Sequence, residues 1–175
     1  MKKYDKSMMK TALVWAKESH CKRRQVGAVL AKEGRIISVG YNGTVAGSKS
    51  NNCEDEIITE IFKCSECGST THHNGKCSLC GSNYMLFSHE EKLLVSKQTV
   101  LHAESNALAF AGRYGISTDG CDLYITLSPC IECSKLIIQH GIRRVVYLEE
   151  YRCNKGLDFL KKHGIEILHL KDDNE

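Results

Sequence analysis

The last third of the chain alternates between short apolar runs and longer amphipathic segments, and this rhythm limits the possible folds more than any other feature. Strand-like and helical segments take turns, beginning with a strand, over residues 121–127, 131–140, 143–149, 155–163 and 165–170. Gly164 follows the second helical segment as a stop signal. Such alternation predicts a parallel sheet section whose faces are covered by helices.

A helix and a hairpin are expected before this series. Apolar residues recur at helical spacing over about residues 8–19. Strand-like runs at 26–31 and 35–40, joined by a tight turn at Glu33 and Gly34, predict an antiparallel hairpin. Together with the later strands, the hairpin gives the expected fold class, an α/β protein with a mixed five-stranded sheet in a three-layer α/β/α sandwich.

Composition sets the class of protein. A chain of 175 residues suits a single domain over 1–175, and no apolar run approaches membrane-spanning length. The net charge of +3 is compatible with a small anionic substrate but does not argue for a nucleic-acid-binding face. We therefore expect a cytoplasmic protein without a membrane or nucleic-acid partner. The ten cysteines favour reduced metal ligands over disulfides, because no signal segment is expected and several cysteines form C-x-x-C pairs.

A polar stretch interrupts the rhythm and is expected to be an insertion at about 50–98. It lacks the strand and helix pattern of its flanks and contains a C-x₂-C-x₉-C-x₂-C arrangement formed by Cys64, Cys67, Cys77 and Cys80. Two such knuckles predict a closed tetrahedral zinc site in a zinc-ribbon-like segment. Nucleic-acid binding is an alternative, but the segment lacks a basic, aromatic surface. Several spare residues could form a different or additional site: Cys21, Cys53, His72, His73 and His89.

Two short motifs supply the residue types of a catalytic metal site. The first places Glu104 two residues after His102, and the second places Cys130 and Cys133 three residues apart. Zinc held by one histidine and two cysteines keeps its fourth position for water, whose pKa falls to roughly 7. Glu104 would then carry protons beside that water.

Each motif stands where a helix is expected to begin. Side chains two apart in mid-helix point to nearly opposite sides, so His102 and Glu104 can converge only at a helix start. A helix-favouring stretch runs from Ala103 to Ala111, with Gly112 near its close, and Pro129 follows a strand-like run at 123–127. A lone C-x-x-C is often a structural zinc clip or a redox pair; the two motifs together favour the catalytic interpretation.

Two further segments carry candidate binding residues. Glycines on both sides of Tyr41 and Asn42 suggest a backbone that approaches something closely, with Asn42 free to bond a sugar hydroxyl or base edge; an ordinary loop turn is the alternative. Arg23 and Arg24 stand at the start of a strand, where they could hold a phosphate or be solvated surface charge.

These residues resemble one family, the deoxycytidylate (dCMP) deaminases of the cytidine deaminase-like fold, in particular those of phages and viruses. The pairing of H-x-E with P-C-x-x-C is the signature of zinc nucleobase deaminases. The resemblance covers nearly everything except the insertion and is carried by "VGAV" at 26–29, "GYNGTVAG" at 40–47, "HAESNALAFAGR" at 102–113, "TLSPCIECSKLIIQHGI" at 126–142 and "YLEEYRCNKGLDFL" at 147–160.

The resemblance implies roles for individual residues. His102, Cys130 and Cys133 would bind the catalytic zinc, and Glu104 would shuttle protons. The backbone at Ala103 would accept the pyrimidine and Asn42 would contact the sugar. Phosphate candidates are Arg23 or Arg24 with Tyr151. Val26 and Ser128 complete the expected substrate site.

The resemblance also implies an activity and its regulation. The reaction would be hydrolysis of dCMP to dUMP and ammonia, which supplies dTMP synthesis. Such enzymes are commonly hexamers. The resemblance implies that dCTP, bound with or without Mg²⁺, activates the enzyme and that dTTP inhibits it. The effector site would comprise Gly40, Tyr41, Asn42 and Gly43, and Arg113 would lie at a subunit interface. If the chain is phage-encoded, the host cytoplasm is its expected location.

Some features depart from the family pattern or leave alternatives open. Phage relatives often have a second zinc site that uses cysteines corresponding to Cys21 and Cys53, whereas this insertion has four cysteines of its own. Ser105 and Ala109 replace commoner larger residues. Alternative substrates are dCTP, a modified dCMP or cytidine; a nucleic-acid-editing deaminase and a zinc-ribbon binding module are more distant alternatives. Cys121 and Cys153 are expected to fill core.

Overall fold

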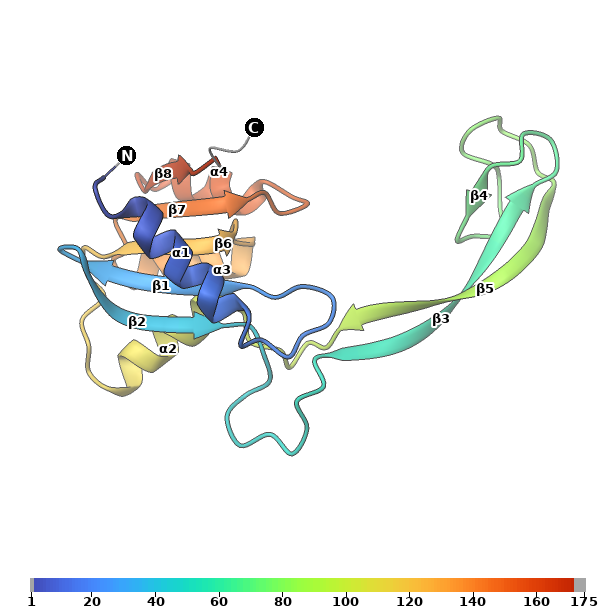
Figure 1. Cartoon of the computed structure of the whole chain (residues 1–175). Helices are drawn as coiled ribbons and strands as arrows, with labels where there is room; N and C mark the ends of the chain where they lie inside the picture. Colours follow the sequence, from blue (N-terminus) through green and yellow to red (C-terminus); the bar gives the residue numbers. More distant parts are fainter. Residues whose placement is uncertain (1, 172–175) are drawn as a thin grey trace. The chain divides into compact units, whose positions relative to one another are not determined.

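The computed structural model describes residues 2–171 of the chain. The chain divides into two compact units (Figure 1). We call Met1–Cys53 with Gln98–Glu175 the core unit, and Glu54–Lys97 the ribbon unit.

The core unit contains a mixed five-stranded sheet in the order β2-β1-β6-β7-β8. Its strands are β1 (Gly27–Lys32), β2 (Arg35–Tyr41), β6 (Asp122–Leu127), β7 (Arg144–Glu149) and β8 (Glu166–His169). Strand β1 is antiparallel to both β2 and β6, whereas β6, β7 and β8 run parallel. The tight turn between β1 and β2 has positive φ at Glu33 (51°) and Gly34 (75°). The predicted fold class and hairpin are therefore confirmed.

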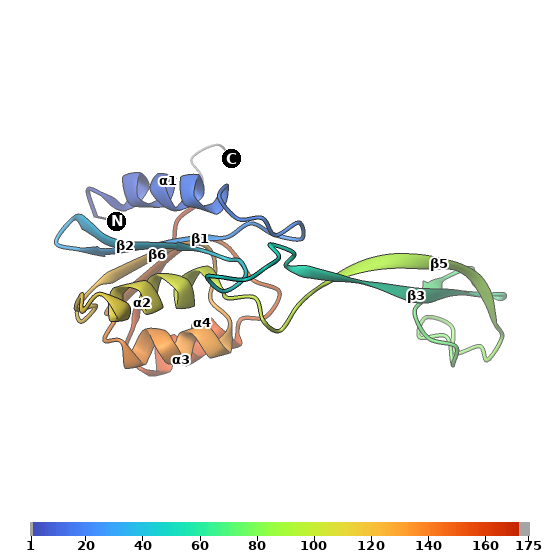
Figure 2. The same ribbon diagram turned by 90° about the horizontal axis from the view of Figure 1, so that it is seen from below.

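Four helices cover the two faces of this sheet. Helix α1 (Asp5–Ala16) lies on one face, and α2 (Ala103–Arg113), α3 (Ile131–Gln139) and α4 (Lys155–Lys162) lie on the other (Figure 2). The first helix begins earlier than its apolar spacing predicts, because the Asp5 carboxylate accepts a hydrogen bond from the Lys2 backbone N–H at 2.6 Å and holds the first turn. None of the helices in residues 2–171 has both the length and the apolar character needed to cross a membrane.

Strand β6 lies at the centre of the core, and all six of its residues are buried. Leu123 and Ile125 pack toward the layer of α2, α3 and α4, whereas Tyr124 packs with Met9 and its neighbours beneath α1. Burial on both faces explains why this strand reads as a continuous apolar run.

A buried ion pair joins α1 to β7. The Arg144 guanidinium donates to both carboxylate oxygens of Asp5, at 2.8 and 2.9 Å, and the Tyr124 hydroxyl donates to Asp5 Oδ1 at 2.8 Å. Burial alone would raise the pKa of Asp5, but the hydrogen bonds from Arg144 and its other donors outweigh it and lower the pKa to about 2.

The ribbon unit is a long antiparallel hairpin. It consists of β3 (Glu54–Cys64) and β5 (Met85–Ser96), with the two-residue β4 (Thr70–Thr71) beside β3. The polar stretch, whose sequence lacks the strand and helix pattern of its flanks, thus forms two long strands. Most side chains of both long strands are exposed, so charged and apolar residues mix on each face and no alternation marks them.

The cysteines outside the metal motifs differ from expectation at three positions. Cys21 and Cys53, which we expected to be reduced, are paired as a disulfide within the core unit. Cys121 is fully buried, as predicted. Cys153 is exposed, so its predicted place in the core is wrong; it lies in the irregular segment before α4.

Candidate active site

Two helix starts bring three candidate ligands together. His102 is the N-cap residue of α2 and Cys130 the N-cap residue of α3, both with extended backbone (φ −77° and −73°). Cys133 lies in the first turn of α3 and is buried. Because Pro129 follows the end of β6 and suits a helix entry, the chain turns directly from the sheet into the ligand-bearing turn.

The spacing of these side chains suits zinc. His102 Nδ1 lies 3.5 Å from Cys130 Sγ and 3.3 Å from Cys133 Sγ. Tetrahedral zinc with its usual bond lengths separates a nitrogen and a sulfur ligand by about 3.5 Å. Among residues 2–171, only His102, Cys130 and Cys133 form this cluster. Three protein ligands leave one tetrahedral position for a reacting molecule.

Hydrogen bonds within the cluster shift the pKa values of Cys130 and His102. A hydrogen bond from Cys133, followed by one from His102, lowers the pKa of Cys130 to about 3, although burial opposes this change. The same bond to Cys130 raises the pKa of His102. These hydrogen bonds therefore favour the thiolate of Cys130, which is the form of cysteine that binds metal.

Glu104 lies beside the cluster without belonging to it. The side chain is in the first turn of α2 and only 3% of the residue is exposed. Burial raises the pKa of its carboxyl group to about 7. A carboxyl group in this range can both accept and release a proton near neutral pH.

Ser128 ties the ligand loop to the neighbouring β7–α4 segment. Its buried hydroxyl accepts a hydrogen bond from the Tyr151 backbone N–H at 2.7 Å, and its own N–H donates to the Glu149 carbonyl at 2.8 Å. Ser128 and Tyr151, both named from the sequence, therefore lie together.

Two residues that the sequence analysis did not name support the same loop. The Ser134 hydroxyl donates to the Cys130 carbonyl at 2.9 Å. A Cβ atom on Gly156 would lie 2.1 Å from the Pro129 carbonyl oxygen and 2.9 Å from Ser134 Oγ, so only glycine lets α4 approach this closely. A glycine inside the first turn of a helix, where helix-forming residues are favoured, was the available signal.

Asn42 is more constrained than expected. Its Oδ1 accepts a hydrogen bond from the Val26 backbone N–H at 2.7 Å, and its Nδ2 donates to the Arg24 carbonyl at 2.8 Å. The amide that we expected to be free thus holds the start of β1, and one of its N–H groups remains for another acceptor. Val26 and Ala103 are both buried.

The two arginines differ in their contacts. Arg24 forms an ion pair with Glu149, and both side chains are about half exposed. Arg23 is also exposed. The structure therefore places one candidate phosphate ligand at the end of β7, next to the segment that carries Tyr151.

The segment 40–43 makes one close approach and borders a hollow. A Cβ atom on Gly40 would lie 2.4 Å from the Ala103 carbonyl oxygen, whereas one on Gly43 would meet only the Tyr41 ring at 3.9 Å. The expected close approach is thus real at Gly40. Tyr41 and Gly43 line a cavity of about 250 Å³ together with His20 and the following loop.

Arg113 ends α2 and is exposed. Its guanidinium lies 5.9 Å from the centre of the Tyr114 ring.

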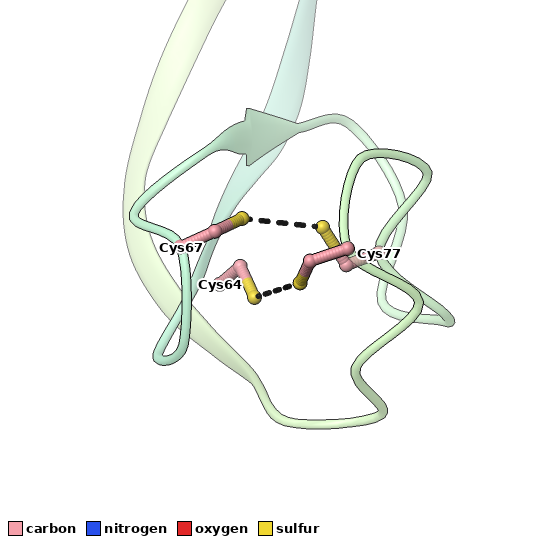
Figure 3. Close-up of side chains that lie close together, drawn as sticks. Cys64, Cys67 and Cys77 are labelled. Atoms are coloured by element: carbon pink, nitrogen blue, oxygen red, sulfur yellow. Dashed lines mark hydrogen bonds between the residues drawn. The ribbon is translucent and has the colours of Figure 1, made fainter.

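The ribbon unit carries a second cluster, formed by Cys64, Cys67, Cys77 and Cys80. The sulfur atoms of Cys64 and Cys80, and of Cys67 and Cys77, are each 3.6 Å apart, and Figure 3 shows the labelled side chains pointing toward one another. Zinc bonded to four sulfurs separates them by about 3.8 Å. A hydrogen bond with Ser69, 3.1 Å away, is the main reason that the pKa of Cys77 falls to about 5.

The spare histidines stay outside both clusters. Within residues 2–171, neither His72, His73 nor His89 joins a metal-ligand group, and His89 instead contacts Glu91 at 3.2 Å.

Comparison with known proteins agrees with this geometry. The family model described as the cytidine and deoxycytidylate deaminase zinc-binding region matches residues 2–149. The deoxycytidylate deaminase of Enterobacteria phage T2 is 37% identical over 94% of this chain and 90% of its own length, and that of phage T4 is 36% identical over 96% and 90%. A crystal structure of the dCMP deaminase from cyanophage S-TIM5, in complex with dCMP and dUMP, covers 97% of this chain and 99% of its own, with 34% identity and a TM-score of 0.72.

Proposed function

The chain belongs to the zinc-binding cytidine and deoxycytidylate deaminases, and on this basis we propose that it hydrolyses dCMP to dUMP and ammonia. The observation that carries the proposal is the cluster of His102, Cys130 and Cys133 with the buried carboxyl group of Glu104 beside it. The phage deoxycytidylate deaminases that resemble the chain along nearly its whole length support dCMP as the substrate.

The chain's own residues supply the proton transfers. Zinc bound by the three ligands provides a Lewis acid and a water of lowered pKa. Glu104 accepts a proton from the attacking water as the oxygen bonds to C4 of cytosine, and passes this proton to N3. It then delivers the second proton of the water to the amino nitrogen at C4, whose bond to carbon breaks to release ammonia. The raised pKa of Glu104 suits a group that must act as base and acid in turn.

Residues around the cluster would hold the rest of the nucleotide. The backbone at Ala103 faces the pyrimidine in this proposal, and the remaining N–H of Asn42 donates to the sugar. The 5′-phosphate takes the place of Glu149 beside Arg24, because that ion pair is exposed and weak enough to exchange. Tyr151 and Arg23 complete the phosphate end, and Val26 and Ser128 line and position the pocket.

Regulation and assembly form the second part of the proposal. The cavity lined by Tyr41 and Gly43 is the candidate effector site for dCTP, with Mg²⁺, and for dTTP. Its volume of about 250 Å³ lies below the usual range for ligand pockets, so a triphosphate would extend outside it. We place the active enzyme in a hexamer with Arg113 at an interface, in the cytoplasm, where its dUMP feeds dTMP synthesis.

A second zinc is proposed for the ribbon unit. The four sulfurs lie at distances that suit a Cys₄ site. Four protein ligands fill all the tetrahedral positions of zinc, so none is left for a reactant. This zinc would be structural, because the hairpin alone buries little apolar surface.

The decisive test is ammonia release from dCMP, CMP, deoxycytidine and dCTP by the zinc-loaded chain, with and without dCTP–Mg²⁺ or dTTP as effector. Turnover of dCMP, raised by dCTP and suppressed by dTTP, is the expected result. Equal turnover of all four compounds would keep the deaminase chemistry and refute the phosphate contacts. No release from any of them would refute the proposed substrate class and direct attention to larger nucleic-acid substrates.

A further inference from the structure

The ribbon unit exposes an unusual share of apolar side chains. Among the described residues, half of the exposed large apolar side chains lie in Glu54–Lys97, which is about a quarter of the chain. Ile58 and Phe87, for example, are 65% and 57% exposed. A two-stranded hairpin is marginally stable in water on its own, so a surface of this kind is expected to be covered in the working protein.

One face of the hairpin combines two of these apolar side chains, Ile58 and Phe87, with acidic ones. The strand register pairs Phe62 with Phe87, Glu60 with Glu90, Ile58 with Lys92 and Glu56 with Leu94, and alternate residues of a strand share a face. We call this the acidic face and define it by Glu56, Ile58, Glu60, Phe87, Glu90 and Lys92.

The charges on the acidic face do not balance within it. Glu60 and Glu90 are directly opposite each other and both exposed, an arrangement of like charges that destabilises a strand pair. Lys92, the one cation among the six residues that define this face, contacts Glu56 at 3.5 Å and not the pair of Glu60 and Glu90. A cation from outside the hairpin would relieve this repulsion.

The outer face of α1 has the complementary pattern. Lys10 and Lys17, the C-cap residue of α1, are exposed, and between them Leu13 and Val14 are 39% and 61% exposed. Lys10 and Lys17 are separated by about 10 Å along the helix. On the acidic face, Glu60 and Glu56 flank Ile58 at a separation of about 13 Å. On both surfaces, apolar side chains thus lie between two charged residues, and the charges are positive on α1 and negative on the acidic face. The two spacings are similar enough for flexible lysine side chains to reach both carboxylates.

From this complementarity we propose that the acidic face of the ribbon unit docks on the outer face of α1 in a second copy of the chain. Two ribbon units would repel each other through their carboxylates, and nucleic acid would be repelled for the same reason. The apolar residues supply affinity, and the charges set partner and register. The inference does not depend on which nucleotide is the substrate.

Charge reversal of either surface tests the contact. The pair E60K/E90K makes the ribbon unit basic there, and K10E/K17E makes α1 acidic. Sedimentation equilibrium of the zinc-loaded full-length chain should show self-association about tenfold or more weaker for each variant alone. High salt should weaken the wild-type association in the same direction.

Mixing the two variants is the sharpest arm of the experiment. Each basic ribbon unit then meets an acidic α1 on another copy, and the unchanged surfaces also match, so association should recover to within about threefold of the wild type. A contact within one chain cannot be restored by mixing. Wild-type association of either variant, or no recovery on mixing, would overturn the proposal.

Matched controls carry the same change in charge elsewhere. E66K/E91K alters the ribbon unit away from the acidic face, because Glu66 lies outside the strands and Glu91 lies on the opposite face. K161E/K162E alters α4, on the other side of the sheet. Both should associate like the wild type. Circular dichroism and ammonia release separate loss of docking from loss of folding or of activity.

Discussion

At the scale of single residues, the proposed proton transfer relies on Glu104, whose side chain is buried. Glu104→Gln keeps the shape and removes the group that exchanges protons, so kcat for dCMP should fall about a thousandfold or more. The variant should retain its zinc content and its circular dichroism spectrum, because Glu104 is outside the ligand cluster. Turnover at the wild-type rate would remove Glu104 from the mechanism.

Gly156 should act on the same site without touching the substrate. In Gly156→Ala, the new Cβ would lie 2.1 Å from the Pro129 carbonyl and displace the loop that holds Cys130. We expect zinc affinity to fall about 10- to 100-fold, as it does when supporting contacts of metal ligands are lost. Competition with a zinc chelator measures this change.

Gly112→Ala provides the control for this substitution. Gly112 is also helical, has no atom within 4 Å of a built Cβ, and should accept alanine without loss of zinc. Equal zinc affinity in both variants would show that α4 does not position the loop.

The sequence predicts the positions of the candidate metal ligands better than the contacts of the candidate substrate-binding residues. His102 and Cys130 could be placed at helix starts because their chemistry and the local helix signals coincide. Asn42 could not be understood in this way, because its amide bonds to backbone groups of Val26 and Arg24 that are distant in sequence. Cys153 was misplaced since composition alone does not distinguish a loop thiol from a core thiol.

At the scale of elements, the second cysteine cluster should determine the folding of the ribbon unit. Cys64→Ser removes one of four ligands, so the chain should lose one zinc and retain the other. Backbone amides of β3 and β5 should lose protection from hydrogen exchange, while those of β6 keep it, because the cluster and β6 belong to different units.

Cys153→Ser is the matched control, since it also removes a thiol but from outside both clusters. It should keep both zinc ions and the protection of β3 and β5. If Cys64→Ser behaves in the same way, the ribbon unit folds without its zinc.

Elements buried on both sides could be predicted, and elements exposed on both sides could not. Strand β6 is buried throughout and mostly apolar because helices cover both faces of the sheet. Strands β3 and β5 lack such a partner within the ribbon unit, so Glu56 and Ile58 can share a face and hide the period of two. The four cysteines still revealed the cluster, because metal ligation depends on residue type and spacing alone.

At the scale of the whole molecule, contacts between distant parts of the sequence hold the core unit together. The pair of Asp5 and Arg144 spans 139 positions and fixes α1 against β7 on the opposite side of the sheet from α2 and the ligand cluster. Arg144 is only 1% exposed and also donates to Glu166 Oε1 at 2.7 Å, but Asp5 is the partner that accepts two of its hydrogen bonds and is itself fully buried. Loss of the Asp5 charge would leave this buried guanidinium with too little compensating negative charge. Asp5→Asn should therefore lower the free energy of unfolding by about 3 kcal/mol.

The same ion pair should make stability depend on pH in the acid range. Because the pKa of Asp5 falls from its usual 3.8 to about 2 on folding, the unfolded chain takes up this proton more readily than the folded chain. The stabilisation is therefore fully present above pH 4 and disappears as the pH falls through 2. Urea unfolding at a series of pH values should show the difference in free energy of unfolding between wild type and Asp5→Asn closing over this window.

Zinc is lost from both proteins at low pH, so the difference between them isolates the contribution of Asp5. Asp158→Asn, on the exposed side of α4, should follow the wild type throughout. A gap that stays constant from pH 5 to pH 2 would mean that Asp5 is not held as a carboxylate by Arg144.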